Sequence, residues 1–121
     1  MIVEVFCTTV FEAIHWWPNA PESVGYLRNR HRHLFHVKVW KLVEGLDRQI
    51  EFITLKQAVN EKIAVLKCQK CETWSCEQWA VAIMKNVGAC RVEVSEDGEN
   101  GALVTAESVF DRLLPASGGP G

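Results

Sequence analysis

The sequence lacks any apolar run that could cross a bilayer, because its longest runs fall far short of the ~20 residues required. It also lacks a basic leader followed by an apolar stretch, so we expect no signal peptide and no membrane partner. Neither sign of charge dominates, since 13 Lys and Arg stand against 15 Asp and Glu, a net charge of −2. This balance argues against a general binder of nucleic acids, which would need a basic face.

The cysteines lack an even pairing, because there are five of them and three crowd into residues 68–76. Such a set is a poor disulfide framework and is typical of a reducing compartment, so we expect a cytoplasmic protein. With 48% apolar residues in 121, the chain predicts one folded domain with a real core. We place that domain at residues 1–114 and expect a flexible Gly/Pro/Ser-rich tail at 115–121.

Hydrophobic periodicity predicts strands and helices in a defined order. Period-2 alternation predicts strands at 2–15, 30–43, 90–95 and 102–105, and a further short strand at 49–53. Helical spacing predicts two helices, each begun by a capping box, one formed by Thr54 with Gln57 and the other by Ser75 with Gln78. Gly88 stands where the second helix should end. Residues 16–30 are expected to form a long loop, and residues 107–114 a short helix.

This order predicts an α+β fold. Four antiparallel strands carry two helices on one face, in the sequence β-β-α-α-β-β. A sheet of this kind has two open edges, and open edges must be covered or paired. We expect neighbouring copies to pair these edges, so that the subunits assemble into a barrel.

Three of the four histidines are candidates for a metal site. His31 and His33 lie two apart on a predicted strand, so both side chains point to one face. In an antiparallel hairpin, His15 at the end of the first strand would lie beside them. Three neutral imidazoles with an open fourth position form the ligand set of a catalytic zinc site, and ordinary strand histidines are the alternative. His36 falls on the opposite face and is excluded as a ligand.

Five segments of the chain resemble, in the same order, motifs of the 6-pyruvoyl-tetrahydropterin synthase / 6-carboxy-tetrahydropterin synthase family. They are FEAIH at 11–15 (family F-x-A-x-H), HRHLFHV at 31–37 (H-G-H-N-Y-x-V), IEFITLK at 50–56 (I-D-F-x-x-L-K), SCEQWA at 75–80 (T-x-E-N-L-A) and VSE at 94–96 with Asn100 and Ala102 beyond it (V-x-E-T, then N-x-A). The matches span residues 11–102, which is most of the chain.

The resemblance implies the tunnelling fold, in which copies assemble into a barrel, often as a hexamer of two trimers. It implies a zinc-dependent lyase with Zn²⁺ on His15, His31 and His33. In this family the zinc polarises groups on the side chain of the substrate, dihydroneopterin triphosphate. The products feed tetrahydrobiopterin or 7-deazaguanine pathways such as queuosine biosynthesis.

The resemblance also implies substrate contacts. The carboxylate of Glu96 would grip a pterin-like ring at a subunit interface, because a carboxylate accepts two parallel N–H bonds from a guanidine-like edge. Ser75 and Phe35 fall within matched segments and are expected to contact the same ring. Without the resemblance, Glu96 would be read as a solvated acid before a turn.

The proton-transfer residues of the family are replaced in this sequence. Leu27 stands where the family has a cysteine, and the Asp-His pair between the helices is missing, with Lys67 and Cys68 in its place. The interhelical loop also holds Cys71. We therefore name Cys68, Lys67 and Cys71 as candidate catalytic residues, since a thiolate near zinc makes a usable base or nucleophile.

Two other interpretations of these replacements stay open. The first is a non-catalytic ring-binding or scaffold relative, which holds a pterin or purine ring without turning it over. The second is a structural metal site formed by Cys68, Cys71 and Cys76, with Cys90 as the remaining candidate for a fourth ligand.

Overall fold

The computed structural model describes residues 1–107. The tail expected at 115–121, and all but the first residue of the helix expected at 107–114, lie outside the described residues. The elements in chain order are β1 (Val3–His15), η1 (Glu22–Arg28), β2 (His31–Val43), α1 (Phe52–Lys67), α2 (Cys76–Val87), β3 (Arg91–Glu96) and β4 (Asn100–Thr105). The predicted α+β class and the order of the strands and the two long helices are confirmed.

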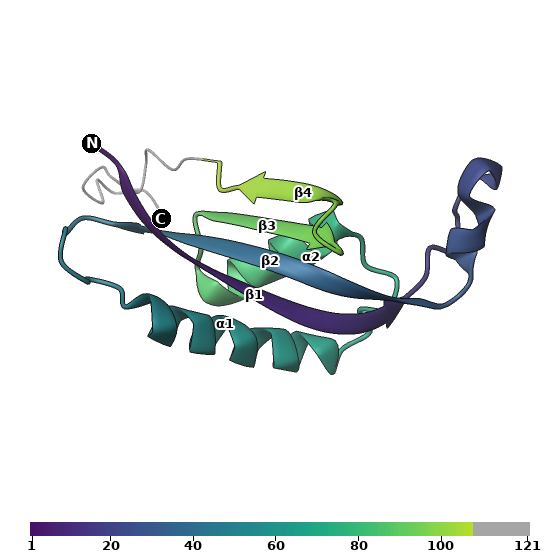
Figure 1. Ribbon diagram of the computed structural model, residues 1–121, viewed down its shortest axis with the longest axis horizontal. Helices are drawn as coiled ribbons and strands as arrows, with labels where there is room; N and C mark the ends of the chain where they lie inside the picture. Colours follow the sequence, from purple (N-terminus) through teal and green to yellow (C-terminus); the bar gives the residue numbers. More distant parts are fainter. Residues whose placement is uncertain (108–121) are drawn as a thin grey trace.

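The four strands form one antiparallel sheet in the order β1-β2-β3-β4 (Figure 1). β1 and β2 pair over their whole length of 13 residues, from Val3 opposite Val43 to His15 opposite His31. The shorter β3 runs beside the middle of β2, with Phe35 opposite Glu96 at one end. Since β1 and β4 lie at the two ends of this order, they are the edge strands of the sheet formed by residues 1–107, as the sequence predicted.

Both helices cover the same face of the sheet (Figure 1). α1 packs against β1, and α2 packs against β3 and β4. The buried side of α1 carries apolar residues at helical spacing, which are Leu55, Val59, Ile63 and Leu66. On α2 the buried positions include Trp79, Ala80 and Ile83.

An aromatic cluster fills the core beneath one end of the sheet. Phe35 and Trp79 are almost completely buried, and Phe11 stacks on Phe35 with ring centroids 5.1 Å apart. Phe11 also contacts Trp79 at 4.8 Å between centroids. Burial of each such side chain contributes roughly 1.5–3 kcal/mol to folding. The cluster therefore packs beneath the end of the sheet where the histidines lie and supports it.

The two ends of α2 follow the sequence prediction. The Ser75 hydroxyl accepts a hydrogen bond from the backbone N–H of Gln78, and the Gln78 side chain accepts one in return from the backbone N–H of Ser75. Gly88 ends the helix in the left-handed region, with φ of 72°. Glycine adopts this conformation without the steric cost of a side chain, which is why it marks helix ends.

The start of α1 differs from the prediction, and the strand expected at 49–53 is wrong. The helix begins at Phe52, because the Glu51 carboxylate accepts hydrogen bonds from the backbone N–H groups of Ile53 and Thr54, at 2.6 and 3.0 Å. These bonds hold the pKa of Glu51 below its usual value, with Ile53 making the largest contribution. A carboxylate at this position accepts from the free N–H groups of the first turn, and the positive end of the helix dipole stabilises its negative charge. The capping residue is therefore Glu51 rather than Thr54.

The segment at 16–30, expected to be loop throughout, contains the short 3₁₀ helix η1. The backbone N–H of Trp17 donates to the carbonyl of Leu27 at 2.8 Å, and the Arg28 side chain donates to the carbonyl of Ala20 at 2.8 Å. These bonds hold the segment as a compact loop at the end of the β1–β2 hairpin, where it projects from the sheet (Figure 1).

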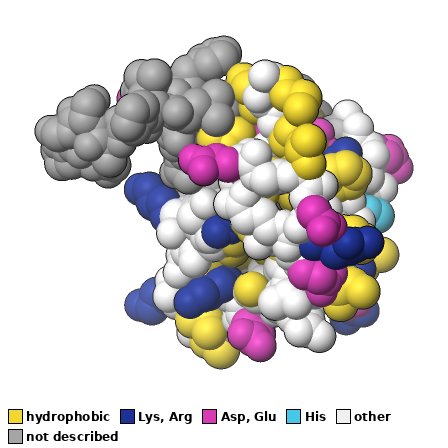
Figure 2. All heavy atoms as spheres, turned by 90° about the vertical axis from the view of Figure 1, so that its left-hand side faces the viewer, with side chains coloured by type: hydrophobic (Ala, Val, Ile, Leu, Met, Phe, Trp, Pro, Cys, Tyr) yellow, Lys and Arg dark blue, Asp and Glu magenta, His cyan; other side chains and the backbone are white. Residues whose placement is uncertain are grey.

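Figure 2 shows the end of the molecule away from the open end of the β1–β2 hairpin, where acidic, basic and apolar side chains lie side by side. This mixture agrees with the small net charge of the sequence. Within residues 1–107, no helix is both long enough and apolar enough to cross a membrane.

Candidate metal centre

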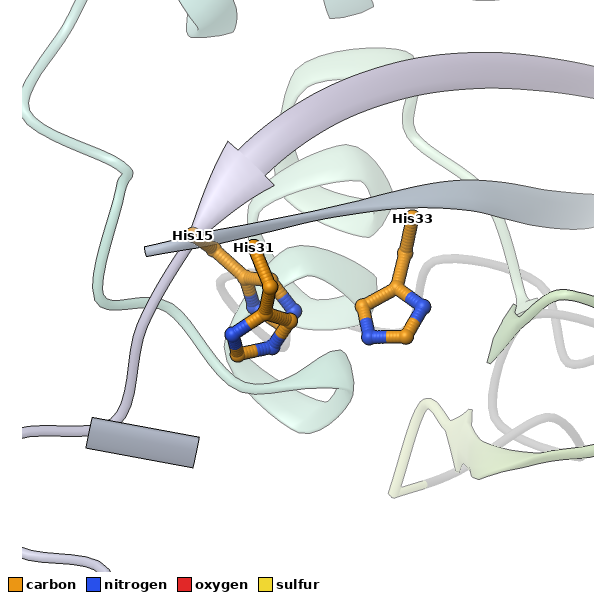
Figure 3. A group of neighbouring side chains, drawn as sticks. All are labelled: His15, His31 and His33. Atoms are coloured by element: carbon orange, nitrogen blue, oxygen red, sulfur yellow. The ribbon is translucent and has the colours of Figure 1, made fainter. Parts of the chain in front are cut away.

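The open end of the β1–β2 hairpin brings three histidines together. His15, the last residue of β1, lies directly opposite His31, the first residue of β2, and His33 lies two residues further along β2. All three side chains leave the strands on the same side, as Figure 3 shows. One ring nitrogen of each lies within 4.8 Å of the other two, so the three could hold one metal ion. The predicted histidine group is therefore confirmed as a candidate metal site.

Two of the rings have their outer nitrogen fixed by an acceptor. His31 Nδ1 lies 2.7 Å from the backbone oxygen of Asn29, and His33 Nδ1 lies 2.7 Å from Oδ2 of Asp97. A carbonyl and a carboxylate can only accept, so each Nδ1 carries the proton and donates it. Each Nε2 then presents a lone pair, which is the form in which a neutral imidazole binds a metal.

His15 is the buried member of the group, with 8% of its surface exposed. Burial lowers the pKa of its imidazole, and the nearby Glu96 carboxylate only partly opposes that effect. A neutral ring is the ligand form. Its Nε2 is buried and has no hydrogen-bond partner, an arrangement that costs about 1–3 kcal/mol unless something else satisfies the atom. A bound cation would satisfy it.

Glu96 lies against the inner nitrogens of two of these rings. It is the last residue of β3 and stands opposite Phe35, on the same face of the sheet as the histidines. Its Oε1 lies 3.5 Å from His15 Nε2, and its Oε2 lies 3.6 Å from His33 Nε2. The carboxylate therefore adds negative charge beside the lone pairs, which favours a cation there.

Asp97, the residue after Glu96, contacts the other side of His33. Its Oδ2 accepts from His33 Nδ1 and its Oδ1 accepts from the backbone N–H of Leu34 at 3.1 Å. The hydrogen bond from His33, followed by that from Leu34, holds the pKa of the Asp97 carboxyl below its usual value. Asp97 is a residue of the candidate site that was not predicted from the sequence. The available signal was its place next to Glu96, at the end of a strand that pairs with the strand of His33.

A cavity of about 460 Å³ opens beside the histidines. His15, His31 and Glu96 line one part of it, and three indole side chains line another, namely Trp16, Trp17 and Trp74. Trp16 and Trp17 follow directly after β1, so the same strand end places both a metal ligand and part of the wall. Flat aromatic walls beside a small number of polar groups are typical of sites for planar organic ligands.

Two of the predicted substrate contacts line the cavity and one does not. Glu96 and Ser75 both lie in its wall. Phe35 is 0% exposed and lies beneath the histidines, where its ring meets the His15 ring edge to face at 5.2 Å between centroids. Its side chain supports His15 rather than facing the cavity.

The three candidate catalytic residues do not line this cavity within one chain. Lys67 and Cys71 line a separate hollow beside β1, together with Glu12 and Arg32. Cys68 is exposed at the end of α1, and its thiol donates to the carbonyl of Ala64 at 3.4 Å. Burial raises the pKa of the Cys71 thiol, which disfavours its thiolate. Within one chain, the side chains of Lys67, Cys68 and Cys71 therefore do not contribute to the cavity wall.

The cavity does contain a different cysteine. Cys76 lies in its wall, and burial raises the pKa of this thiol to about 11, so the thiol is protonated at neutral pH. Leu27 also lines the cavity and makes that part of its wall apolar.

The alternative cysteine metal site is not assembled in the described structure. Among residues 1–107, His15, His31 and His33 are the one group of three or more potential ligands at metal-binding spacing. Cys68, Cys71, Cys76 and Cys90 are all free thiols. The histidines remain as the candidate site.

No protein-family model matches the chain, and no curated protein matches it significantly.

Proposed function

We propose that this chain binds Zn²⁺ through His15, His31 and His33 and holds a flat, pterin-like or purine-like ring in the adjoining cavity. The observation that supports this most strongly is the state of the three Nε2 atoms. Those of His31 and His33 carry lone pairs because their Nδ1 atoms donate elsewhere, and that of His15 is buried without a partner. A cation is the ligand that all three can share.

Zinc is the metal we favour for this site. Three neutral imidazoles with a fourth position open are the ligand set of catalytic zinc sites, although other divalent metals also accept nitrogen ligands. When bound, the zinc would act as a Lewis acid toward a hydroxyl or carbonyl of the substrate. The protein's own part is to orient the three rings and to keep them neutral, which burial does for His15.

The ring would lie between the indoles and Glu96. Trp16, Trp17 and Trp74 offer aromatic faces on which a flat heterocycle can stack. A carboxylate at the edge of the cavity can accept two parallel N–H bonds from an amino-oxo heterocycle, and Glu96 is such a group. Stacking plus a bidentate acceptor would select planar rings with adjacent N–H donors.

The reaction we propose is that of a lyase resembling 6-carboxy-/6-pyruvoyl-tetrahydropterin synthase, acting on dihydroneopterin triphosphate or a related ring. We also propose that the product feeds pathways such as queuosine biosynthesis. The proposed location is the cytoplasm, where five free cysteines would stay reduced. We further propose the tunnelling fold, with the open edges of β1 and β4 pairing between copies into a homo-oligomeric barrel such as a hexamer. Such an assembly would let a neighbour supply Lys67, Cys68 and Cys71.

A non-catalytic ring-binding relative is the second candidate, and two observations favour it. Leu27 lines the cavity where a proton-transfer cysteine would be needed, and the thiol of Cys76 has a pKa of about 11. A cavity with these groups binds a ring and a metal without an evident thiol base. The two candidates share the zinc and the ring and differ in turnover.

Metal content of the purified protein tests the shared part. Protein isolated without added metal should contain one zinc per chain, His31→Ala should lose it, and His36→Ala should keep it. His36 is the matched control because it lies on the same strand but on the opposite face, paired with Val10. No zinc in the wild type, or equal zinc in the two variants, would contradict the proposal.

Turnover then separates the two candidates. Quenching of tryptophan fluorescence by pterin and purine rings measures binding in the cavity, and loss of triphosphate from dihydroneopterin triphosphate measures the reaction. A lyase requires both signals, and its rate should fall in Cys68→Ala or Cys71→Ala. Binding without release of triphosphate would support the non-catalytic interpretation instead.

A further inference from the structure

The turn between β3 and β4 is tied to β2 by a single residue, Asp97. Its backbone N–H donates to the carbonyl of Leu34 at 2.6 Å. Its carboxylate accepts from the backbone N–H of Leu34 through Oδ1, at 3.1 Å, and contacts His33 Nδ1 through Oδ2, at 2.7 Å. Asp97 also has a φ of 55°, a conformation that few residues other than glycine adopt readily but that aspartate and asparagine tolerate. Three bonds to two adjacent residues thus hold it in place.

We propose that Asp97 is a positioning residue of the metal site, whose carboxylate fixes the His33 tautomer with the proton on Nδ1 and the Nε2 lone pair directed toward His15 and His31. This inference rests on the metal site proposed above, and it assigns a role to a residue outside the three ligands. The ring centroid of His33 lies 4.9 Å from that of His31 and 5.2 Å from that of His15, so His33 belongs to the same compact group (Figure 3). Of the three rings, His33 is the one that the Asp97 carboxylate contacts.

The two carboxylate oxygens of Asp97 have different hydrogen-bond partners, and this arrangement sets the tautomer of His33. Oδ1 is engaged by the Leu34 N–H, which can only donate. Oδ2 faces Nδ1 and, as part of an ionised carboxylate, can only accept. Nδ1 must therefore carry the ring proton, and Nε2 must be the free nitrogen. A carboxylate bonded to the outer nitrogen also makes the imidazole a more basic metal ligand.

His33 differs in this respect from His31. His31 Nδ1 donates to a neutral backbone carbonyl, that of Asn29. Both Asp97 and the His33 ring are partly exposed, with side-chain exposures of 44% and 23%, so water competes for an uncharged partner more readily than for a carboxylate. His33 therefore has a charged acceptor where His31 has a neutral one.

Asp97→Asn is the decisive substitution, because it keeps the shape and the tolerance for positive φ while replacing one acceptor by a donor. If the amide oxygen keeps the Leu34 N–H, the amide NH₂ faces His33 Nδ1 and favours the tautomer with the proton on Nε2. If the amide turns over, its oxygen can still accept from His33 Nδ1, but the NH₂ then opposes the Leu34 N–H, which disfavours this orientation. The variant therefore loses either the support for the metal-binding tautomer or a bond that holds the turn in place, and we expect zinc affinity to fall by about 10–100-fold.

Two further variants make the result specific. Asp97→Gly removes both acceptors while allowing the same positive φ, and it should also weaken zinc binding if the carboxylate is what matters. Glu99→Gln removes one negative charge from the same exposed turn. It should leave zinc affinity within about twofold, because salt screens the charge of an exposed carboxylate. The Glu99 variant is the matched control for a general electrostatic effect.

Two readouts decide the proposal, neither of which depends on enzyme activity. Zinc affinity is measured by competition with a chelator of known strength. Two-dimensional ¹H–¹⁵N NMR of the imidazole nitrogens in the metal-free protein reports the tautomer of His33, which we expect to carry its proton on Nδ1 in the wild type and to lose that preference in Asp97→Asn.

Zinc affinity of Asp97→Asn equal to that of Glu99→Gln, or a wild-type His33 protonated on Nε2, would overturn the proposal. A wild type that binds no zinc would instead refute the proposed function. The NMR measurement still decides the role of Asp97 in that case, so the two failures are distinguishable.

Discussion

His15 and His31 face each other across the open end of the β1–β2 hairpin, with ring centroids 4.4 Å apart. Their alignment depends on the register of the whole β1–β2 hairpin. A shift of one residue in either strand would move one of the two histidine side chains to the opposite face of the sheet. The stacked pair of Phe11 and Phe35, four residues back from the histidines on each strand, fixes that register from the core. The geometry of the candidate metal site therefore depends on core packing.

Zinc should stabilise the folded protein through His15. For a ligand that binds only the native state, a free concentration of one hundred times Kd adds about 2.7 kcal/mol to the free energy of unfolding. We expect this gain in the wild type and its absence in His15→Ala, measured by urea unfolding with and without zinc. The variant His36→Ala should keep the gain, and a full gain in His15→Ala would exclude His15 as a ligand.

Glu96→Gln should weaken ring binding far more than zinc binding. The amide can accept only one of the two N–H bonds that the carboxylate would accept, and a lost charge-assisted hydrogen bond of about 1.5–3 kcal/mol corresponds to roughly 10–100-fold in Kd. Fluorescence titration with a pterin measures the ring, and metal content measures the zinc. Glu77→Gln is the control, because Glu77 lies in the same cavity wall and carries the same charge. Equal ring affinity in both variants would remove Glu96 as the anchor.

Ser75→Ala should lower the free energy of unfolding by about 1 kcal/mol, because it removes the hydroxyl that caps α2. Ser75→Asp keeps an acceptor at the helix start and should retain most of the stability. Chemical denaturation measures both variants. An alanine variant as stable as the wild type would mean that water replaces the cap without cost.

Much of the fold and the grouping of the three histidines could be predicted from the sequence, because the signals are local. Alternation over 13 residues identifies β1 and β2, and the spacing of His31 and His33 places both on one face. The capping box at Ser75 and the glycine at 88 bound α2 for reasons that lie within a few residues of chain. Antiparallel pairing then brings His15 to the other two without further information.

The parts that could not be predicted depend on contacts between distant segments. Asp97 meets His33 across 64 positions of sequence, and its place next to Glu96 is a weak local signal for that contact. The placement of Phe35 beneath His15 depends on the helices that bury it. The strand expected at 49–53 is wrong for a local reason. The Glu51 carboxylate accepts from the free N–H groups of α1, and this cap outweighs the apolar alternation of the segment.

Glu4 should make stability depend on pH in the acid range. Hydrogen bonds from Arg91, the largest cause, hold the pKa of Glu4 below its usual value of 4.5 in the folded protein. A lowered folded pKa means that the stabilisation is fully present above the unfolded pKa and is lost as the pH falls through the folded pKa. The wild type should therefore lose stability below about pH 4.5 more steeply than Glu4→Gln does.

Unfolding free energies at several pH values between 3 and 7 would measure that difference in slope. Glu44→Gln is the control, because Glu44 is an exposed carboxylate in the turn after β2. Its variant should keep the wild-type slope. Parallel slopes for the wild type and Glu4→Gln would mean that the pair with Arg91 is no stronger in the folded protein than in the unfolded chain.

Gly101→Ala should disrupt the hairpin that carries the site's two carboxylates. A Cβ atom at Gly101 would lie 2.0 Å from the backbone oxygen of Val94 and 2.5 Å from the Cα of Ser95. Neither is a flexible side-chain end, so β4 must move away from β3, at a cost at or above the ~1–3 kcal/mol typical of overpacking. Because Glu96 and Asp97 end that strand pair, zinc affinity should fall together with stability. Gly25→Ala is the control, since its Cβ would meet only the Arg28 side chain, at 3.5 Å. A Gly101→Ala variant with wild-type stability and zinc affinity would show that the hairpin can shift without moving the carboxylates.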